Sequence, residues 1–189
     1  MSNLTVDKID ADIAGLMNGF GFDSRPIPSL FSLLRLSLFI PLLSAFFSLI
    51  SILSIYLFYK GSDSSFGGYF SYLLSDGWIV VIPTVVIGLF FSFMTYNSLI
   101  MYMSVPKELR DKSVILGHLK KVACRTASAF LLLMLLTALL SGTYSRLAFA
   151  IPLLELVMFF AINLVVGSEI NRLGAGMALE KISQLIKKI

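Results

Sequence analysis

Residues 78–103 read WIVVIPTVVIGLFFSFMTYNSLIMYM, and no charged side chain interrupts them. A helix needs about 20 mostly apolar residues to cross the hydrocarbon core of a bilayer, so this stretch predicts a transmembrane helix. Runs of similar character predict three further spans, at residues 36–59, 126–144 and 147–168. The sequence therefore predicts an all-α, polytopic membrane protein with four transmembrane helices.

The fourth run must be argued for, because it contains the acidic residue Glu155. Its Leu, Ile, Val and Phe residues each favour insertion by about 0.3 to 0.6 kcal/mol, whereas one central carboxylate costs about 3 kcal/mol. The run has thirteen such apolar residues, so the balance favours a membrane span. Only residues 142–146 connect it to the third span, which predicts a tight antiparallel hairpin.

The composition fits a bundle that faces lipid. Hydrophobic residues make up 57% of the 189 residues and charged residues 14%, whereas soluble domains carry about 25% charged residues. The segments outside the spans are too short for a second cored domain. We expect an N-terminal segment at 1–35, a transmembrane domain at 36–168 and a C-terminal segment at 169–189, with amphipathic helices in both terminal segments.

The basic residues are distributed unevenly. Of the fifteen Lys and Arg residues, thirteen lie in the N-terminal segment, the loop between spans two and three, and the C-terminal segment. The remaining two are Lys60 and Arg146. Short loops rich in Lys and Arg stay in the cytoplasm, so both termini and the central loop are expected there. Basic residues beside spans commonly meet anionic headgroups, which predicts membrane lipids as partners rather than nucleic acid.

Glu155 is the most conspicuous candidate for function. An acid near the middle of a span costs several kcal/mol unless it is protonated, paired or hydrated. One interpretation is a proton or cation site, or an interhelical hydrogen bond that selects a partner. The alternative is a structural acid bonded to a Ser, Thr or Tyr of a neighbouring helix.

Two amides and two small residues are further candidates for contacts between helices. Asn97 and Asn163 lie within spans two and four, where amides commonly form hydrogen bonds across a bundle. Ala138 and Gly142 form a small-xxx-small pair that permits close approach of another helix. Either a contact within the bundle or a homo-oligomer would use this pair.

The loop at residues 60–77 is the only connection between spans on the expected external side that is large enough to present a surface. Its aromatic side chains either rest at headgroup level or form a recognition patch. The hairpin between spans three and four adds one exposed aromatic candidate. The candidate interaction residues are Phe66, Tyr69, Phe70, Tyr72 and Tyr144.

The sequence offers little for catalysis. It has one His and one Cys, no His or Cys cluster with metal-ligand spacing, and no GxSxG, Walker or GxGxxG motif. We expect His118 to be a solvated loop residue. The chain is therefore predicted to be no enzyme and to have no catalytic, metal or cofactor site.

The layout resembles a family, the conjugative-plasmid entry-exclusion proteins of the TraS type. The resemblance rests on small size, basic charge, four spans with both ends inside, the Ile27-Pro28-Ser29-Leu30 lead, and the exit from span four at Glu169-Ile170-Asn171-Arg172-Leu173-Gly174. It covers most of the chain, but it does not assign a functional role to any individual residue.

The resemblance implies a bacterial inner-membrane protein that blocks redundant DNA transfer into a cell already carrying the plasmid. Recognition of the donor's TraG mating-pair protein would provide the specificity, through the aromatic loop, the hairpin or the cytoplasmic segments. Two alternatives stay open: a small channel or carrier component that uses Glu155, and an accessory subunit of a larger membrane complex.

Overall fold

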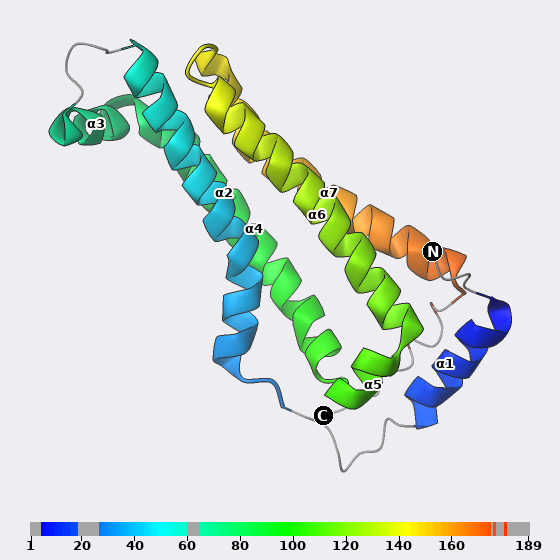
Figure 1. Cartoon of the computed structure of the whole chain (residues 1–189). Helices are drawn as coiled ribbons and strands as arrows, with labels where there is room; N and C mark the ends of the chain where they lie inside the picture. The colour runs from blue at the N-terminus through cyan, green and yellow to red at the C-terminus, as the bar shows by residue number, and fades with distance from the viewer. Residues whose placement is uncertain (1–4, 19–26, 60–64, 175, 177–179, 181–189) are drawn as a thin grey trace.

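The computed structural model describes residues 5–18, 27–59, 65–174, 176 and 180, and within them the chain is helical without strands (Figure 1). Four of its helical stretches are long and apolar enough to cross a membrane, which confirms the all-α, four-span prediction. In chain order the elements are α1 (Val6–Asn18), α2 (Leu30–Tyr59), α3 (Phe66–Tyr72), the π-helical turn η2 (Leu73–Gly77), α4 (Trp78–Met103), α5 (Lys107–Lys112), α6 (Val114–Leu140), the 3₁₀ turn η3 (Ser145–Phe149) and α7 (Ala150–Arg172).

Two of the long helices begin earlier than the apolar runs. The Ser29 hydroxyl accepts a hydrogen bond from the backbone N–H of Ser32, 3.3 Å away, so α2 begins at Leu30 instead of residue 36. The Ser113 hydroxyl likewise accepts from the N–H of Leu116 at 3.1 Å, and α6 begins at Val114. Hydroxyl side chains at these positions satisfy N–H groups that have no partner within the helix, which explains both starting points.

The region after residue 64 differs from the expected loop. Residues 66–77 are helical, and Figure 1 shows α3 turned away from the axis of α4 near the C-terminal end of α2. Ser65 caps α3 by accepting from the N–H of Gly68 at 3.1 Å. The lack of a side chain at Gly68 also leaves room for the Tyr56 hydroxyl of α2.

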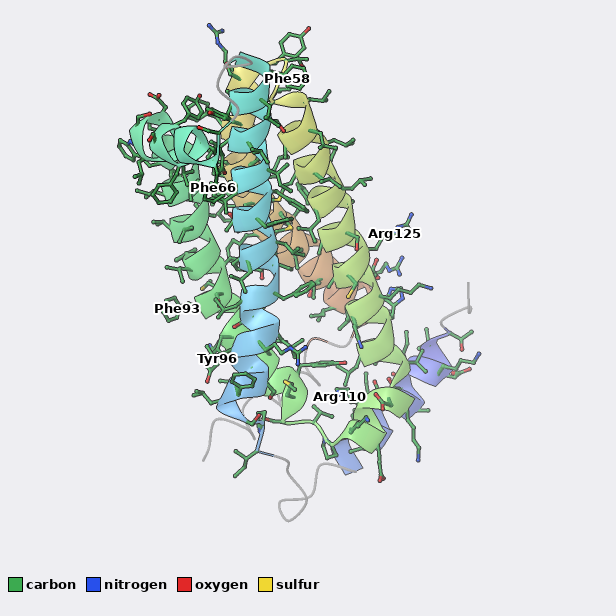
Figure 2. All side chains as sticks on the ribbon, turned by 60° about the vertical axis from the view of Figure 1, so that its left-hand side comes forward. Phe58, Phe66, Phe93, Tyr96, Arg110 and Arg125 are labelled. Atoms are coloured by element: carbon green, nitrogen blue, oxygen red, sulfur yellow. The ribbon has the colours of Figure 1, made fainter. Side chains whose placement is uncertain are left out.

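In Figure 1, α2 lies beside α4 and α6 beside α7, and α2 also contacts α6 and α7. Phe91, Met134, Met158 and Phe159 form a buried core among α4, α6 and α7. The outer faces carry exposed Leu and Phe side chains along the length of the bundle, as Figure 2 shows for Phe93. An apolar surface this extensive is typical of a protein solvated by lipid.

The small-residue pair of the third span is used inside this bundle. Ala138 and Gly142 are both buried within the single chain. The next hydroxyl, Ser141 Oγ, shares its proton between the carbonyl oxygen of Ala138 at 2.7 Å and that of Ser51 on α2 at 3.0 Å. A Cβ atom at Gly142 would collide with the ring of Phe58. These residues therefore bring α6 close to α2, and no second copy is needed to explain them.

The helix expected near the N-terminus is present as α1 and is attached to the start of α6. One carboxylate oxygen of Asp12, Oδ2, accepts from the Ser113 hydroxyl at 2.8 Å and from the backbone N–H of Ile115 at 2.9 Å. Ile9 of α1 is buried with Ile115. The acid thus satisfies the N-terminus of a helix far along the chain, a contact that the sequence analysis did not anticipate.

The opposite end of α7 also differs from expectation. His118 is no solvated loop residue: it lies on α6, and its Nε2 is 3.1 Å from Oε2 of Glu169, which also contacts Arg172 at 2.7 Å. The chain leaves helical geometry at Gly174, whose φ is +64°, a conformation that favours glycine. Most of the amphipathic helix expected at 169–189 lies outside the described residues.

Candidate functional site

Glu155 lies in the centre of the helix bundle, with an exposed fraction of 0%. It projects from α7 toward Gly88 of α4 and Pro41 of α2. A Cβ atom at Gly88 would lie 3.1 Å from Oε1 of Glu155 and 2.9 Å from Cβ of Pro41. The carboxyl group thus occupies space that exists because residue 88 has no side chain.

The hydrogen bonding of this carboxyl is incomplete. Ser44 of α2 is next to it, but the Ser44 hydroxyl donates to the carbonyl oxygen of Ile40 at 3.2 Å. Within the described part of the chain, neither carboxyl oxygen of Glu155 has a hydrogen-bond partner. A buried polar group without a partner costs about 1–3 kcal/mol. Ser44 places a hydroxyl beside the acid, and the carboxyl oxygens keep capacity for a proton or a polar ligand.

The acid sits within a line of buried hydroxyl groups that we call the serine seam. Four of its members recur on one face of α2 at intervals of seven, four and three residues. The seam consists of Ser37, Ser44, Ser48 and Ser51 on α2, Thr84 and Ser92 on α4, and Ser141 on α6.

Hydrogen bonds of the seam join helices at both of its ends. The Ser92 hydroxyl donates to that of Ser37 at 3.1 Å, which links α4 to α2. The bond from Ser141 to Ser51 links α6 to α2 at the other end. Small hydroxyl residues allow membrane helices to approach closely. The seam therefore holds α2 against its neighbours and places one hydroxyl, that of Ser44, beside Glu155.

We expect Glu155→Gln to keep the folded bundle, because the amide has the size of the carboxyl group and carries no charge. The change in the free energy of unfolding should stay below about 1.5 kcal/mol, the usual limit for volume-conserving replacements. Reversible unfolding of the purified protein in lipid–detergent mixtures would measure it. A loss of several kcal/mol would mean that an ionised carboxylate is needed for packing.

The two asparagines do not join Glu155. Both Asn97 and Asn163 are exposed on the described surface. The side-chain Nδ2 of Asn163 donates to the carbonyl oxygen of Phe159 on its own helix at 2.8 Å. The polar contact between α2 and α4 is instead made by serines, which the sequence analysis did not single out.

The predicted aromatic patch divides into two faces. Tyr69 and Tyr72 pack around Tyr56 of α2 with ring centroids 6.0 and 5.9 Å from it, and the Tyr69 hydroxyl donates to the carbonyl oxygen of Leu49 at 3.2 Å. Phe66 and Phe70 point away from this cluster and are 84% and 53% exposed. The tyrosines thus fix α3 on α2, and the phenylalanines remain available for contact.

Tyr144 of the hairpin between α6 and α7 is also exposed, at 70%. Figure 1 shows this hairpin and α3 at the same end of the bundle, opposite α1 and α5. Figure 2 shows Phe66 at that end and Arg110 at the other. The structure therefore brings the two predicted external regions to one end, although they form no continuous patch through a described contact.

Among the described residues, no group of three His, Cys, Asp or Glu side chains is arranged to hold a metal ion. Comparisons with protein families, curated proteins and solved structures find no match for this chain. The fold and the site together define the class as a four-span membrane protein with a buried acid in a polar seam.

Proposed function

We propose that this protein is an interaction protein of a bacterial inner membrane, and specifically an entry-exclusion factor of the TraS type. It would act in the recipient cell by contacting a TraG-type protein of the donor. The observation that carries the proposal is the exposed pair Phe66 and Phe70, held on a short helix at the charge-poor end of the bundle. Contact with a donor protein requires no catalysis.

The charge distribution supports an orientation with the basic end in the cytoplasm. Lys107 and Arg110 belong to α5, and Lys120 lies near the start of α6. The opposite end contains α3 and the hairpin, whose described residues include one basic residue, Arg146 (Figure 1). The sequence adds only Lys60 on that side. Because Lys and Arg in short loops are retained inside, Phe66 and Phe70 would face the periplasmic interface.

The packing of α3 supports a role in recognition. The tyrosine cluster already anchors this helix, so Phe66 and Phe70 are not needed to hold it in place. Exposed aromatic side chains on a fixed backbone lose little conformational freedom on binding and often dominate the energy of an interface. Membrane headgroups would also accommodate these rings, so the decisive measurement is biological specificity.

We expect the Phe66→Ala/Phe70→Ala double variant to abolish most of the reduction in transfer that the unchanged chain gives in recipient cells. Loss of two interface aromatics of about 2 kcal/mol each would weaken binding by roughly a thousandfold. Conjugation frequency from donors of the matching plasmid measures this effect, with an unrelated plasmid as reference.

The matched control is Phe93→Ala, because the exposure of Phe93, 77%, lies between those of Phe66 and Phe70, and Phe93 lies on α4 away from α3 (Figure 2). It should exclude donors as well as the unchanged protein does. If the unchanged chain leaves transfer from every donor unaffected, the proposed function is wrong. If exclusion occurs but survives the double variant, the contact surface lies elsewhere.

The unpartnered carboxyl of Glu155 favours a second candidate, a small channel or carrier component for protons or cations. The serine seam would then line part of the route. Flux in reconstituted vesicles tests this candidate: transport that disappears in Glu155→Gln would support it. Equal leakage from vesicles with the unchanged and variant proteins would remove it.

A further inference from the structure

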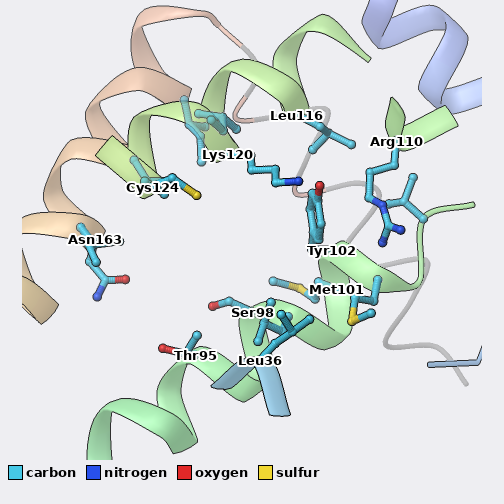
Figure 3. Close-up of a pocket in the computed structure, with 18 of the residues that line it drawn as sticks. Leu36, Thr95, Ser98, Met101, Tyr102, Arg110, Leu116, Lys120, Cys124 and Asn163 are labelled. Atoms are coloured by element: carbon cyan, nitrogen blue, oxygen red, sulfur yellow. The ribbon is translucent and has the colours of Figure 1, made fainter. Parts of the chain in front are cut away.

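A large cavity opens between α4, α6 and α7, toward the end of the bundle that carries α5. Its volume is about 960 Å³, near the upper limit for ligand pockets. Figure 3 shows residues that line it from these helices. Most of the wall is apolar, including Phe91, Met94, Leu99, Leu119, Ile162 and Val166.

Basic side chains line the end of the cavity near α5. The Arg110 guanidinium lies over the ring of Tyr102, with Cζ 4.9 Å from the ring centroid. Figure 3 shows the Lys120 side chain extending toward the same tyrosine from α6. Lys107 and the acidic Asp111 also contribute to the lining. In the part of the chain that the structure describes, neither Arg110 nor Lys120 forms an ion pair.

We propose that this cavity binds an anionic phospholipid, with its acyl chains against the apolar wall and its phosphate between Arg110 and Lys120. The apolar wall of the cavity fits acyl chains, and its basic end fits a phosphate group. A ligand that covers both regions needs both parts. A free phosphate compound would leave the apolar wall uncovered, and a zwitterionic lipid would bring no net charge to the cations. Basic pockets between transmembrane helices commonly bind anionic headgroups. The inference is independent of the exclusion function and adds a ligand to the fold.

The chain contains its own reporter for this site. Cys124 is the single cysteine, is exposed and lines the cavity. Its reaction with an uncharged maleimide can be followed in nanodiscs of phosphatidylcholine with and without phosphatidylglycerol. When the concentration of an occupying lipid is ten times its dissociation constant, labelling should slow about tenfold. Glycerol phosphate, the headgroup without acyl chains, should give no protection.

Charge variants test the headgroup contact. Lys120→Ala combined with Arg110→Ala should remove the difference between the two nanodisc compositions. Lys121→Ala is the matched control, because this neighbour on α6 is basic and exposed but does not line the cavity. It should keep full protection by phosphatidylglycerol.

Glycine variants test the acyl-chain contact without disturbing the packing. Gly167 lines the cavity, and a Cβ atom there would meet no other atom within 4 Å. Gly167→Leu should therefore fold but reduce the amount of phosphatidylglycerol retained by the purified protein in native mass spectrometry. Gly117→Leu is the control, because Gly117 has equal space and lies outside the cavity lining.

Three results would overturn the proposal. Equal protection by both nanodisc compositions would show that the cavity does not select an anionic lipid. Protection by glycerol phosphate alone would identify a site for a soluble anion. Equal losses in the Lys121→Ala control and the double charge variant would reduce the effect to general surface charge. None of these results depends on the outcome of the conjugation assay.

Discussion

The Gly88→Leu variant should fail to form the packed bundle. The first side-chain atom at position 88 would already lie 2.9 Å from Cβ of Pro41 and 3.1 Å from Oε1 of Glu155. Both neighbours are constrained, since Pro41 is part of α2 and Glu155 is fully buried on α7. The larger leucine can be accommodated only if α2, α4 and α7 separate.

Overpacking of a tight core typically costs about 1–3 kcal/mol and occasionally more. We expect Gly88→Leu to lower the free energy of unfolding by more than about 3 kcal/mol, because separation of the helices would also disrupt the serine seam. The matched replacement Gly167→Leu should cost little, since residue 167 faces open space. Unfolding in lipid–detergent mixtures would compare the two variants. Equal stability of both would mean that α4 and α7 do not meet around Gly88 as the structure describes.

The Glu155→Lys variant should have an effect of similar size through charge. A lysine here would place an ammonium group among Gly88, Pro41 and Ser44, and none of these carries an acidic side chain. A basic side chain at the centre of a membrane helix costs about 2.5–3.5 kcal/mol even by insertion measurements. The extra length of lysine adds steric strain in a site with no exposed surface.

We therefore expect Glu155→Lys to yield little folded protein, whereas Glu155→Gln stays close to the unchanged chain. Size-exclusion profiles after mild solubilisation, followed by unfolding titration of any folded fraction, measure the difference. A stable Glu155→Lys protein would reveal that the centre of the bundle is hydrated. That result would favour the channel candidate over a sealed seam.

The number and positions of the spans follow from composition, because any run of about 20 apolar residues lowers its free energy by entering lipid. The predicted span at 78–103 coincides with α4. The ends of the others shifted in both directions. Hydroxyl caps at Ser29 and Ser113 let α2 and α6 begin earlier than predicted. The hairpin and its 3₁₀ turn make α6 end at Leu140 instead of residue 144 and α7 begin at Ala150 instead of residue 147. An apolar run therefore indicates a span but not the ends of its helix.

Which faces of the helices turn inward was harder to predict. In a soluble protein the apolar face is buried, but membrane helices are apolar on all sides and bury their small residues instead. The seven-residue spacing between Ser37 and Ser44, and again between Ser44 and Ser51, carries this signal in the sequence. The sequence places Glu155 within the fourth span. Its contact with Gly88 depends on the crossing of three helices, which leaves no local pattern in the sequence.

The aromatic segment illustrates a different error. Its glycines and serines indicate a loop, and as a loop its aromatics form one undivided patch. In a helix, Phe66 and Phe70 lie four residues apart on one face, and Tyr69 and Tyr72 share another. Contact with Tyr56 of α2 decides which face turns inward, and that contact is tertiary. The cavity near Lys120 is tertiary as well, since residues of α4, α6 and α7 line it together.

We propose a fourfold crossing that leaves the basic end of the bundle inside the cell and the hairpin outside. Labelling with a membrane-impermeant maleimide in intact bacterial cells tests it most directly. Lys121→Cys in a Cys124→Ser background reports the basic end, because residue 121 is exposed and does not line the cavity. Tyr144→Cys in the same background reports the hairpin. We expect the hairpin variant to react in intact cells and the Lys121→Cys variant to react only after permeabilisation. Labelling of the Lys121→Cys variant in intact cells, with a protected hairpin, would show the opposite orientation.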